Sequence, residues 1–119
     1  MAIGVDIEDI RRFHNKSQDF LDRVYTKSEQ EYCLSKKLPA KHFAVRFCAK
    51  EAVLKALTGL NIPHPPLNMI EVYHIENNFP KIRLLNNLDN KLTFEVSLSH
   101  DKTKAIAFVM IDDRGFNAV

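Results

Sequence analysis

The sequence predicts an α+β fold, with helices mainly in the N-terminal half packed on an antiparallel-rich sheet from the C-terminal half plus the N-terminal strand. Apolar residues follow a helical spacing in the first half of the chain, whereas beyond residue 70 they fall in short strand-like segments. Helices and strands that are segregated along the chain favour α+β over parallel βαβ units. With 119 residues, we expect one domain that spans residues 1–119.

The predicted elements begin with a short strand and continue as a series of helices. Residues 2–7 alternate between apolar residues and Gly or Asp, which is typical of a strand. Asp9 can cap a short helix that should break within residues 15–17. After a second helical stretch, the spacing from Thr26 to Glu29 matches a capping box, so a further helix should begin at or near Thr26. We expect Pro39 to end that helix.

The longest predicted helix, from about Ala40 to Leu57, is almost wholly apolar and yet carries four charged residues. Small residues form one face and bulky residues another, which leaves little circumference for solvent. Charged groups on such a helix must be paired or bound to a charged ligand. The simplest interpretation of Glu51 and Lys55 is an intrahelical ion pair worth a few tenths of a kcal/mol. The other two charged residues are Arg46 and Lys50.

The second half of the chain reads as a loop followed by strands. Gly59 and three prolines within residues 63–66 predict a non-helical connection. Hairpin turns are expected at Asn77–Pro80 and Asp101–Lys104. Four strands are predicted, and they begin near Ile70, Lys81, Leu92 and Ala105.

Composition and charge exclude several classes of protein. A hydrophobic content of 45% and a charged content of 27% are typical of globular proteins. No apolar run is long enough to cross a bilayer and the N-terminus does not resemble a signal peptide, so we expect a cytoplasmic protein without a membrane partner. A net charge of +2 does not indicate nucleic acid. Cys33 and Cys48 lack zinc-type spacing and are expected to be reduced structural thiols.

Three segments together indicate a function, although each is weak alone. An acid at the end of a strand, such as Asp6, is commonly solvated, and His100 follows the apolar phase of its strand like a core histidine. In the order GVDIED, RFCAKEAVLKA and VSLSHD, the segments resemble the holo-acyl-carrier-protein synthase family, the small phosphopantetheinyl transferases. The resemblance covers nearly the full length and includes FLDRVYTKSE.

The resemblance implies a transferase that moves the 4′-phosphopantetheine arm of coenzyme A onto a serine of an apo acyl carrier protein. The second product would be adenosine 3′,5′-bisphosphate. It also implies a homotrimer with active sites at the subunit interfaces. The expected partners are therefore coenzyme A, the carrier protein and further copies of the chain. Whether the carrier serves fatty-acid, polyketide or other synthesis stays open.

The family's metal-binding positions fall on Asp6 and Glu51. These carboxylates would hold Mg²⁺, because a hard cation removes the repulsion between two acids. Lys55 falls on the motif lysine that would pair with pyrophosphate oxygens, and it completes the predicted catalytic set. The general base stays open between a metal-bound water, Glu51 and His100.

The predicted coenzyme A contacts are Lys55 and three further motif positions. Arg46 and His100 fall on positions that resemble phosphate contacts, and Arg46 would reach from a neighbouring subunit. Lys50 belongs to the same motif without a defined role. The sequence departs from the family in the loop at residues 58–66, where Gly59 is followed by prolines instead of a glycine-rich turn. The segment HNKSQDF is also shorter than usual.

Two alternatives and one docking surface complete the predictions. Two acids and a lysine would also suit another Mg²⁺-dependent phosphoryl enzyme, such as a nuclease or phosphohydrolase. A binding module without chemistry would instead use a basic patch of Arg11, Arg12, Lys36, Lys37 and Lys41. For the transferase, an acidic carrier protein is expected to dock on the first helical region, through Arg11, Arg12, Lys16 and Arg23 with Phe13 and Phe20 between them.

Overall fold

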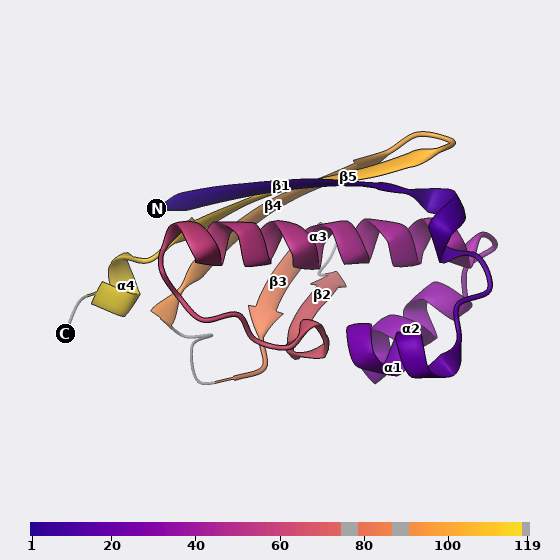
Figure 1. Cartoon of the computed structure of the whole chain (residues 1–119), viewed down its shortest axis with the longest axis horizontal. Coiled ribbons are helices and arrows are strands. Elements are labelled where there is room, and N and C mark those ends of the chain that lie inside the picture. Colours follow the sequence, from indigo (N-terminus) through magenta and orange to yellow (C-terminus); the bar gives the residue numbers. More distant parts are fainter. Residues whose placement is uncertain (75–78, 87–90, 118–119) are drawn as a thin grey trace.

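In the computed structural model, which describes residues 1–74, 79–86 and 91–117, a long helix lies across a three-stranded antiparallel sheet (Figure 1). The helix is α3 (Pro39–Gly59). The sheet has the order β1-β5-β4 and consists of β1 (Ala2–Asp9), β5 (Lys104–Asp112) and β4 (Thr93–His100). The N-terminal strand thus pairs with a strand from the C-terminal end, and the predicted α+β class is confirmed.

A second sheet and the short helices lie on the other side of α3 (Figure 1). The two-stranded sheet pairs β2 (Ile70–His74) with β3 (Pro80–Leu84). In Figure 1, α1 and α2 lie near the N-terminal end of α3, away from the three-stranded sheet. The helix α3 is therefore covered on opposite sides, as its nearly all-apolar sequence requires. The remaining elements are η1 (Ile10–Phe13), α1 (Gln18–Val24), α2 (Lys27–Leu34), η2 (Leu67–Met69) and α4 (Arg114–Asn117).

The starts of the first helices follow their sequence signals. The Asp9 carboxylate accepts from the backbone N–H of Arg11, and the predicted capping box of Thr26 and Glu29 is formed. Pro39 behaves differently from the prediction: α2 ends at Leu34, and Pro39 opens α3. Proline is well suited to the first turn of a helix, because its missing N–H would have no intrahelical partner there.

The packing of β1 on α3 reverses the usual orientation of an amphipathic strand. The helix presents Ala52 and Ala56, both fully buried, and at Gly4 a Cβ atom would collide with the Ala52 carbonyl. The strand face that carries Gly4, Asp6 and Glu8 therefore packs toward the helix. The apolar residues of β1 point away from the helix and remain 50 to 61% exposed; these are Ile3, Val5 and Ile7.

Several further predictions can be compared with the structure. Cys33 and Cys48 are free and buried, and burial raises the pKa of both thiols to about 12, as expected of inert structural cysteines. The hairpin at Asp101–Lys104 is formed, and the Asp101 carboxylate accepts from the backbone N–H groups of Thr103 and Lys104. Of the predicted turn at residues 77–80, residues 77 and 78 lie outside the described chain. In the described residues, every helix is too short or too polar to span a bilayer.

Candidate active site

The predicted catalytic residues Asp6 and Lys55 meet where β1 crosses α3. The Lys55 Nζ donates to Asp6 Oδ1 at 3.1 Å and to the backbone carbonyl of Val5 at 2.9 Å. The Lys55 side chain is 55% exposed, whereas that of Asp6 is 12% exposed. Within the described residues no ion pair joins Lys55 to Glu51, so the expected intrahelical pair is replaced by one between helix and strand. This arrangement presents an ammonium group to solvent from a fixed position.

Glu51 shares this site, one helical turn before Lys55. Burial raises the pKa of Glu51 and the negative charge of Asp6 raises it further, while Lys55 and His64 act in the opposite direction. Of the two carboxylates predicted to bind metal, Asp6 therefore disfavours the ionised form of Glu51.

Glu8 is a third carboxylate of the site that the sequence interpretation missed. Burial and the adjacent Asp6 raise the pKa of Glu8 to about 7, and Glu51 contributes in the same direction. Glu8 also forms an ion pair with Arg12 at 2.6 Å. The sequence could have pointed to Glu8, because it lies two residues after Asp6 and therefore on the same face of the strand.

The electrostatics of this cluster suit a hard cation. Asp6 Oδ2 is buried and has no hydrogen-bond partner among the described residues, which is unusual for a carboxylate oxygen. Carboxylate oxygens are the ligands that Mg²⁺ prefers, and a cation would lower the pKa values that the mutual repulsion raises. No group of three His, Cys, Asp or Glu side chains is arranged as a metal site in residues 1–74, 79–86 and 91–117. Asp6 and Glu51 therefore fit a metal whose remaining ligands come from water or substrate.

Lys50, although predicted to bind coenzyme A, lies fully buried in an ion pair. Its Nζ donates to Glu29 Oε1 at 2.7 Å, to the carbonyl of Leu67 at 2.9 Å and to the carbonyl of Ile70. A lysine ammonium has three N–H donors, so these acceptors occupy all of them. Burial lowers the pKa of Lys50, and the Glu29 carboxylate opposes this effect. The observed contacts tie α3 to α2 and to the start of β2, and the coenzyme A contact of Lys50 stays a prediction.

Arg46 is also buried, but its guanidinium is only partly satisfied. Nη2 lies 3.2 Å from His74 Nδ1, the guanidinium lies 4.2 Å from the centre of the Tyr32 ring, and Nε has no hydrogen-bond partner among the described residues. The rings of Tyr32 and His74 stack with their centres 5.0 Å apart. These side chains line a cavity of about 280 Å³. Within the described chain Arg46 forms no ion pair, so its charge is available to an anion.

His100 is exposed at the end of β4, so the simple expectation of a core histidine is wrong. It lines a cavity of about 500 Å³ together with Lys41 and Lys102. Among the described residues, no hydrogen bond or ion pair connects His100 or Arg46 to the cluster around Asp6. The structure thus brings Asp6, Glu51 and Lys55 together. It leaves Arg46 and His100 in separate cavities and buries Lys50 in an ion pair.

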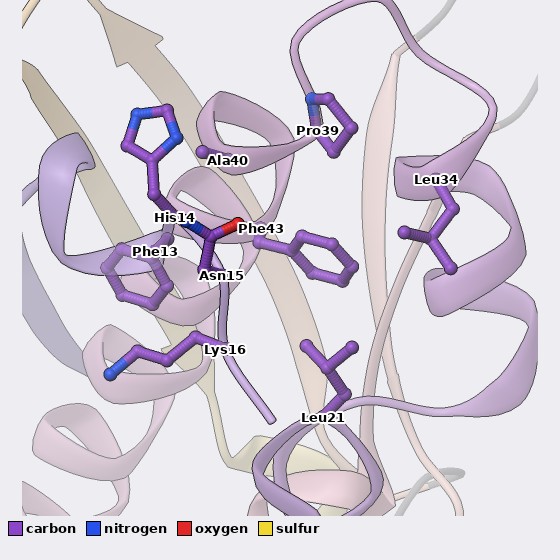
Figure 2. Close-up of a pocket in the computed structure, with 9 residues that line it drawn as sticks. All are labelled: Phe13, His14, Asn15, Lys16, Leu21, Leu34, Pro39, Ala40 and Phe43. Carbon is purple, nitrogen blue, oxygen red and sulfur yellow. The ribbon is translucent and has the colours of Figure 1, made fainter. Parts of the chain in front are cut away.

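Two residues of the region predicted to dock a carrier protein, Phe13 and Lys16, line a further cavity of about 280 Å³ (Figure 2). Figure 2 shows Leu21, Leu34 and Phe43 directed toward one another from three helices, with the Lys16 ammonium pointing away from them. The Lys16 ammonium instead lies 4.6 Å from the centre of the Phe20 ring. Phe13 is buried, so of the two phenylalanines predicted to contact the carrier protein only Phe20 is partly exposed.

Comparison with known proteins relates the whole arrangement to one group of enzymes. The family model for the 4′-phosphopantetheinyl transferase superfamily matches residues 2–109. The holo-[acyl-carrier-protein] synthase of Protochlamydia amoebophila is 41% identical over 118 residues, which cover 92% of this chain and 96% of that protein.

Two solved structures agree with this relationship. The Helicobacter pylori holo-[acyl-carrier-protein] synthase in complex with coenzyme A has a TM-score of 0.76 at 30% identity, over 92% of this chain and 99% of the other. The Bacillus anthracis synthase, in complex with CoA (3′,5′-ADP), has a TM-score of 0.77 at 27% identity, over 92% of this chain and 94% of the other. The chain therefore belongs to the 4′-phosphopantetheinyl transferase superfamily, and within it to the holo-[acyl-carrier-protein] synthases, which are transferases.

Proposed function

We propose that residues 1–119 act as one domain that transfers 4′-phosphopantetheine from coenzyme A to a serine of an apo acyl carrier protein. The reaction would require Mg²⁺ and release adenosine 3′,5′-bisphosphate. The observation that carries the proposal is the cluster of Asp6, Glu51 and Lys55 between β1 and α3, in which a buried carboxylate oxygen lacks a partner. Solved relatives from two bacteria bind coenzyme A, which supports it as the donor.

Each residue of the cluster has a distinct part in this proposal. Asp6 and Glu51 would hold the Mg²⁺ ion, which when bound would neutralise pyrophosphate charge and polarise the phosphorus under attack. Lys55 uses two of its N–H groups on Val5 and Asp6, and it keeps a third for a pyrophosphate oxygen. Because its position is fixed before substrate arrives, Lys55 would stabilise the developing charge of the leaving group without reorganisation.

The outer face of the three-stranded sheet supports a homotrimer. Five large apolar side chains of β1 and β5 are 40 to 61% exposed on this face: Ile3, Val5, Ile7, Ile106 and Phe108. A contiguous apolar face of this kind marks an interface. Asp6 lies between Val5 and Ile7 on β1, so subunits that cover the face would border the active site. We propose that Arg46 and His100, each outside the Asp6 cluster of its own chain, contact coenzyme A phosphates, and that Arg46 does so from a neighbouring subunit.

A single reaction tests the transferase against another phosphoryl enzyme. The chain is mixed with coenzyme A, Mg²⁺ and an apo acyl carrier protein, and the carrier is analysed by mass spectrometry. We expect a mass increase equal to one phosphopantetheine, and no increase when Mg²⁺ is chelated. Cleavage of coenzyme A without modification of the carrier would instead indicate a phosphohydrolase.

Since Cys33 and Cys48 are free thiols, the proposed compartment is the cytoplasm.

A further inference from the structure

One polar side chain beside the active site has no part in the proposed function so far. Glu51, Lys55 and Thr58 lie at positions i, i+4 and i+7 of α3, and such positions share one face of a helix. Thr58 Oγ1 lies 2.6 Å from Nε2 of His64, in the loop that follows α3. The helix face that carries Glu51, Lys55 and Thr58 therefore leads to the imidazole ring of His64.

The hydrogen bonds of Thr58 indicate how the ring is oriented. Thr58 Oγ1 donates to the carbonyl of Leu54 at 3.0 Å, so its only hydrogen is used there. The hydroxyl oxygen must then accept a hydrogen bond from His64 Nε2. The imidazole is thus held through Nε2, and Nδ1 stays available for a second partner.

The loop around His64 is rigid although the side chain itself is exposed. Asn61, two residues after the end of α3, has a φ of +61°, and the backbone N–H of Ile62 donates to the carbonyl of Leu57 at 3.0 Å. Ile62 and Pro65, on either side of His64, are buried. An exposed polar side chain between two anchored positions loses little conformational entropy when it binds a ligand.

The loop sequence leaves His64 as its main donor toward the site. Pro63, Pro65 and Pro66 have no backbone N–H, so within residues 63–66 only His64 can donate a hydrogen bond to a ligand that extends past Lys55. Since Thr58 shares the helix face of Glu51 and Lys55 and lies 2.6 Å from His64 Nε2, the ring lies at the end of that face.

We propose that His64 is a further coenzyme A-binding residue, whose imidazolium donates through Nδ1 to a pyrophosphate oxygen beside Lys55 while Thr58 holds Nε2. The inference rests on the proposed function, because it names a second pyrophosphate contact within the same site. Charge-assisted hydrogen bonds to phosphate are the stronger ones, and Thr58 orients the donor in advance.

Calorimetric titration of the full chain with coenzyme A and with dephospho-coenzyme A, which lacks the 3′-phosphate, tests the proposal. We expect His64→Ala to weaken both ligands about ten-fold, as for loss of one charged hydrogen bond. His64→Gln should restore part of the affinity, because its amide can replace a donor but not the charge. Thr58→Val should weaken both ligands to a smaller extent. The matched control is Lys91→Ala, which removes a positive charge before β4, at the opposite end of that strand from His100.

Steady-state kinetics provide the second readout. His64→Ala should raise KM for coenzyme A and leave KM for the carrier protein unchanged, which a loss of folding would not do. Equal affinities of the unaltered chain and both His64 variants would overturn the proposal. A loss confined to coenzyme A would place His64 on the 3′-phosphate and overturn the pyrophosphate contact. If the unaltered chain binds neither ligand, the proposed function itself fails, and the inference fails with it.

Discussion

At the scale of single residues, the site depends on carboxylates that the fold holds at close range. Asp6 and Glu51 come from a strand and a helix, and Glu8 adds a third acid whose pKa is raised to about 7. Carboxyl groups such as Glu8 and Glu51, whose pKa values are raised by burial and by the neighbouring charge of Asp6, are typical of functional sites rather than of stabilising ion pairs. Burying carboxylates next to one another lowers the stability of the fold, which is consistent with a cluster that serves to bind a cation and phosphate.

We expect Asp6→Ala and Glu51→Ala each to remove most turnover while the chain stays folded. In the proposed function these side chains hold the cation, and their removal relieves repulsion within the cluster. Activity with saturating Mg²⁺ should fall by about 10²-fold or more, as for loss of a preorganised electrostatic group. Circular dichroism should stay unchanged and thermal stability should not fall. Near-normal Mg²⁺-dependent activity in either variant would contradict the metal assignment.

At the scale of elements, local signals were predictable and the contacts between elements were not. The start of α2 was predicted because a capping box involves residues three apart. Pro39 was misplaced because proline is compatible both with the end of one helix and with the first turn of the next. The alternation in β1 shows its two faces but not which face packs on α3; the close approach at Gly4 decides that.

Because contacts between elements were not predictable, the partners of two charged residues of α3 were not identified from the sequence. The family motif identified Asp6, Glu51 and Lys55, which the structure brings together, because these positions lie in recognisable segments. Glu29 and His74 were not identified, since their partners on α3 are 21 and 28 residues away in the chain. Pairings of this kind depend on tertiary packing, which a single sequence does not show.

The ion pair between Lys50 and Glu29 is expected to stabilise the junction of α2, α3 and β2. Lys50→Met leaves a buried carboxylate that keeps only the backbone N–H groups of Thr26 and Val72. Loss of one partner from a buried pair should lower the free energy of unfolding by about 3 kcal/mol, measured in urea. The double variant Lys50→Met with Glu29→Leu should be less destabilised than the sum of the single changes. A raised KM for coenzyme A with unchanged stability would instead support a direct coenzyme contact of Lys50.

His42, on α3, should make stability depend on pH. Burial first, and then the charge of Arg46, lower its pKa from the ordinary 6.5 to about 4. Between these values the unfolded chain binds a proton that the folded chain does not, so stability should fall as the pH falls from 6.5 toward 4. His42→Gln should make the curve flatter in this window. Because Glu8 has a raised pKa and acts in the opposite direction, the difference between the two proteins is the informative quantity. Identical curves would contradict the prediction.

At the scale of the whole molecule, we expect the exposed apolar face of β1 and β5 to determine how copies of the chain associate. Phe108 lies at the middle of this face, paired with Val5 across the two strands. We expect Phe108→Lys to convert a trimer into monomers in sedimentation experiments, because a charge at this position could not be buried without a partner. Activity should fall with the trimer. Phe79→Lys, at an exposed apolar residue before β3, is the matched control and should leave the trimer intact. A monomeric wild-type chain with full activity would contradict the interfacial site.

The surface proposed to dock the carrier protein is connected to the active site through one ion pair. Arg12 is 61% exposed, as expected of a residue that meets an acidic partner, but it also pairs with Glu8 at 2.6 Å. A carboxylate of the carrier would therefore compete with Glu8 for Arg12. Arg12→Gln tests the contact without placing a second acid beside Glu8, as a charge reversal would.

We expect Arg12→Gln to raise KM for the carrier protein several-fold and to change KM for coenzyme A little, with Lys91→Gln as the control for loss of one charge. The effect should fade with added salt, because the screening length decreases from ~10 Å at 0.1 M to ~3 Å at 1 M. Equal increases in both KM values would mean that Arg12 acts mainly through Glu8 on the coenzyme site. In that case the ion pair, rather than the exposed charge of Arg12, would be its contribution to the reaction.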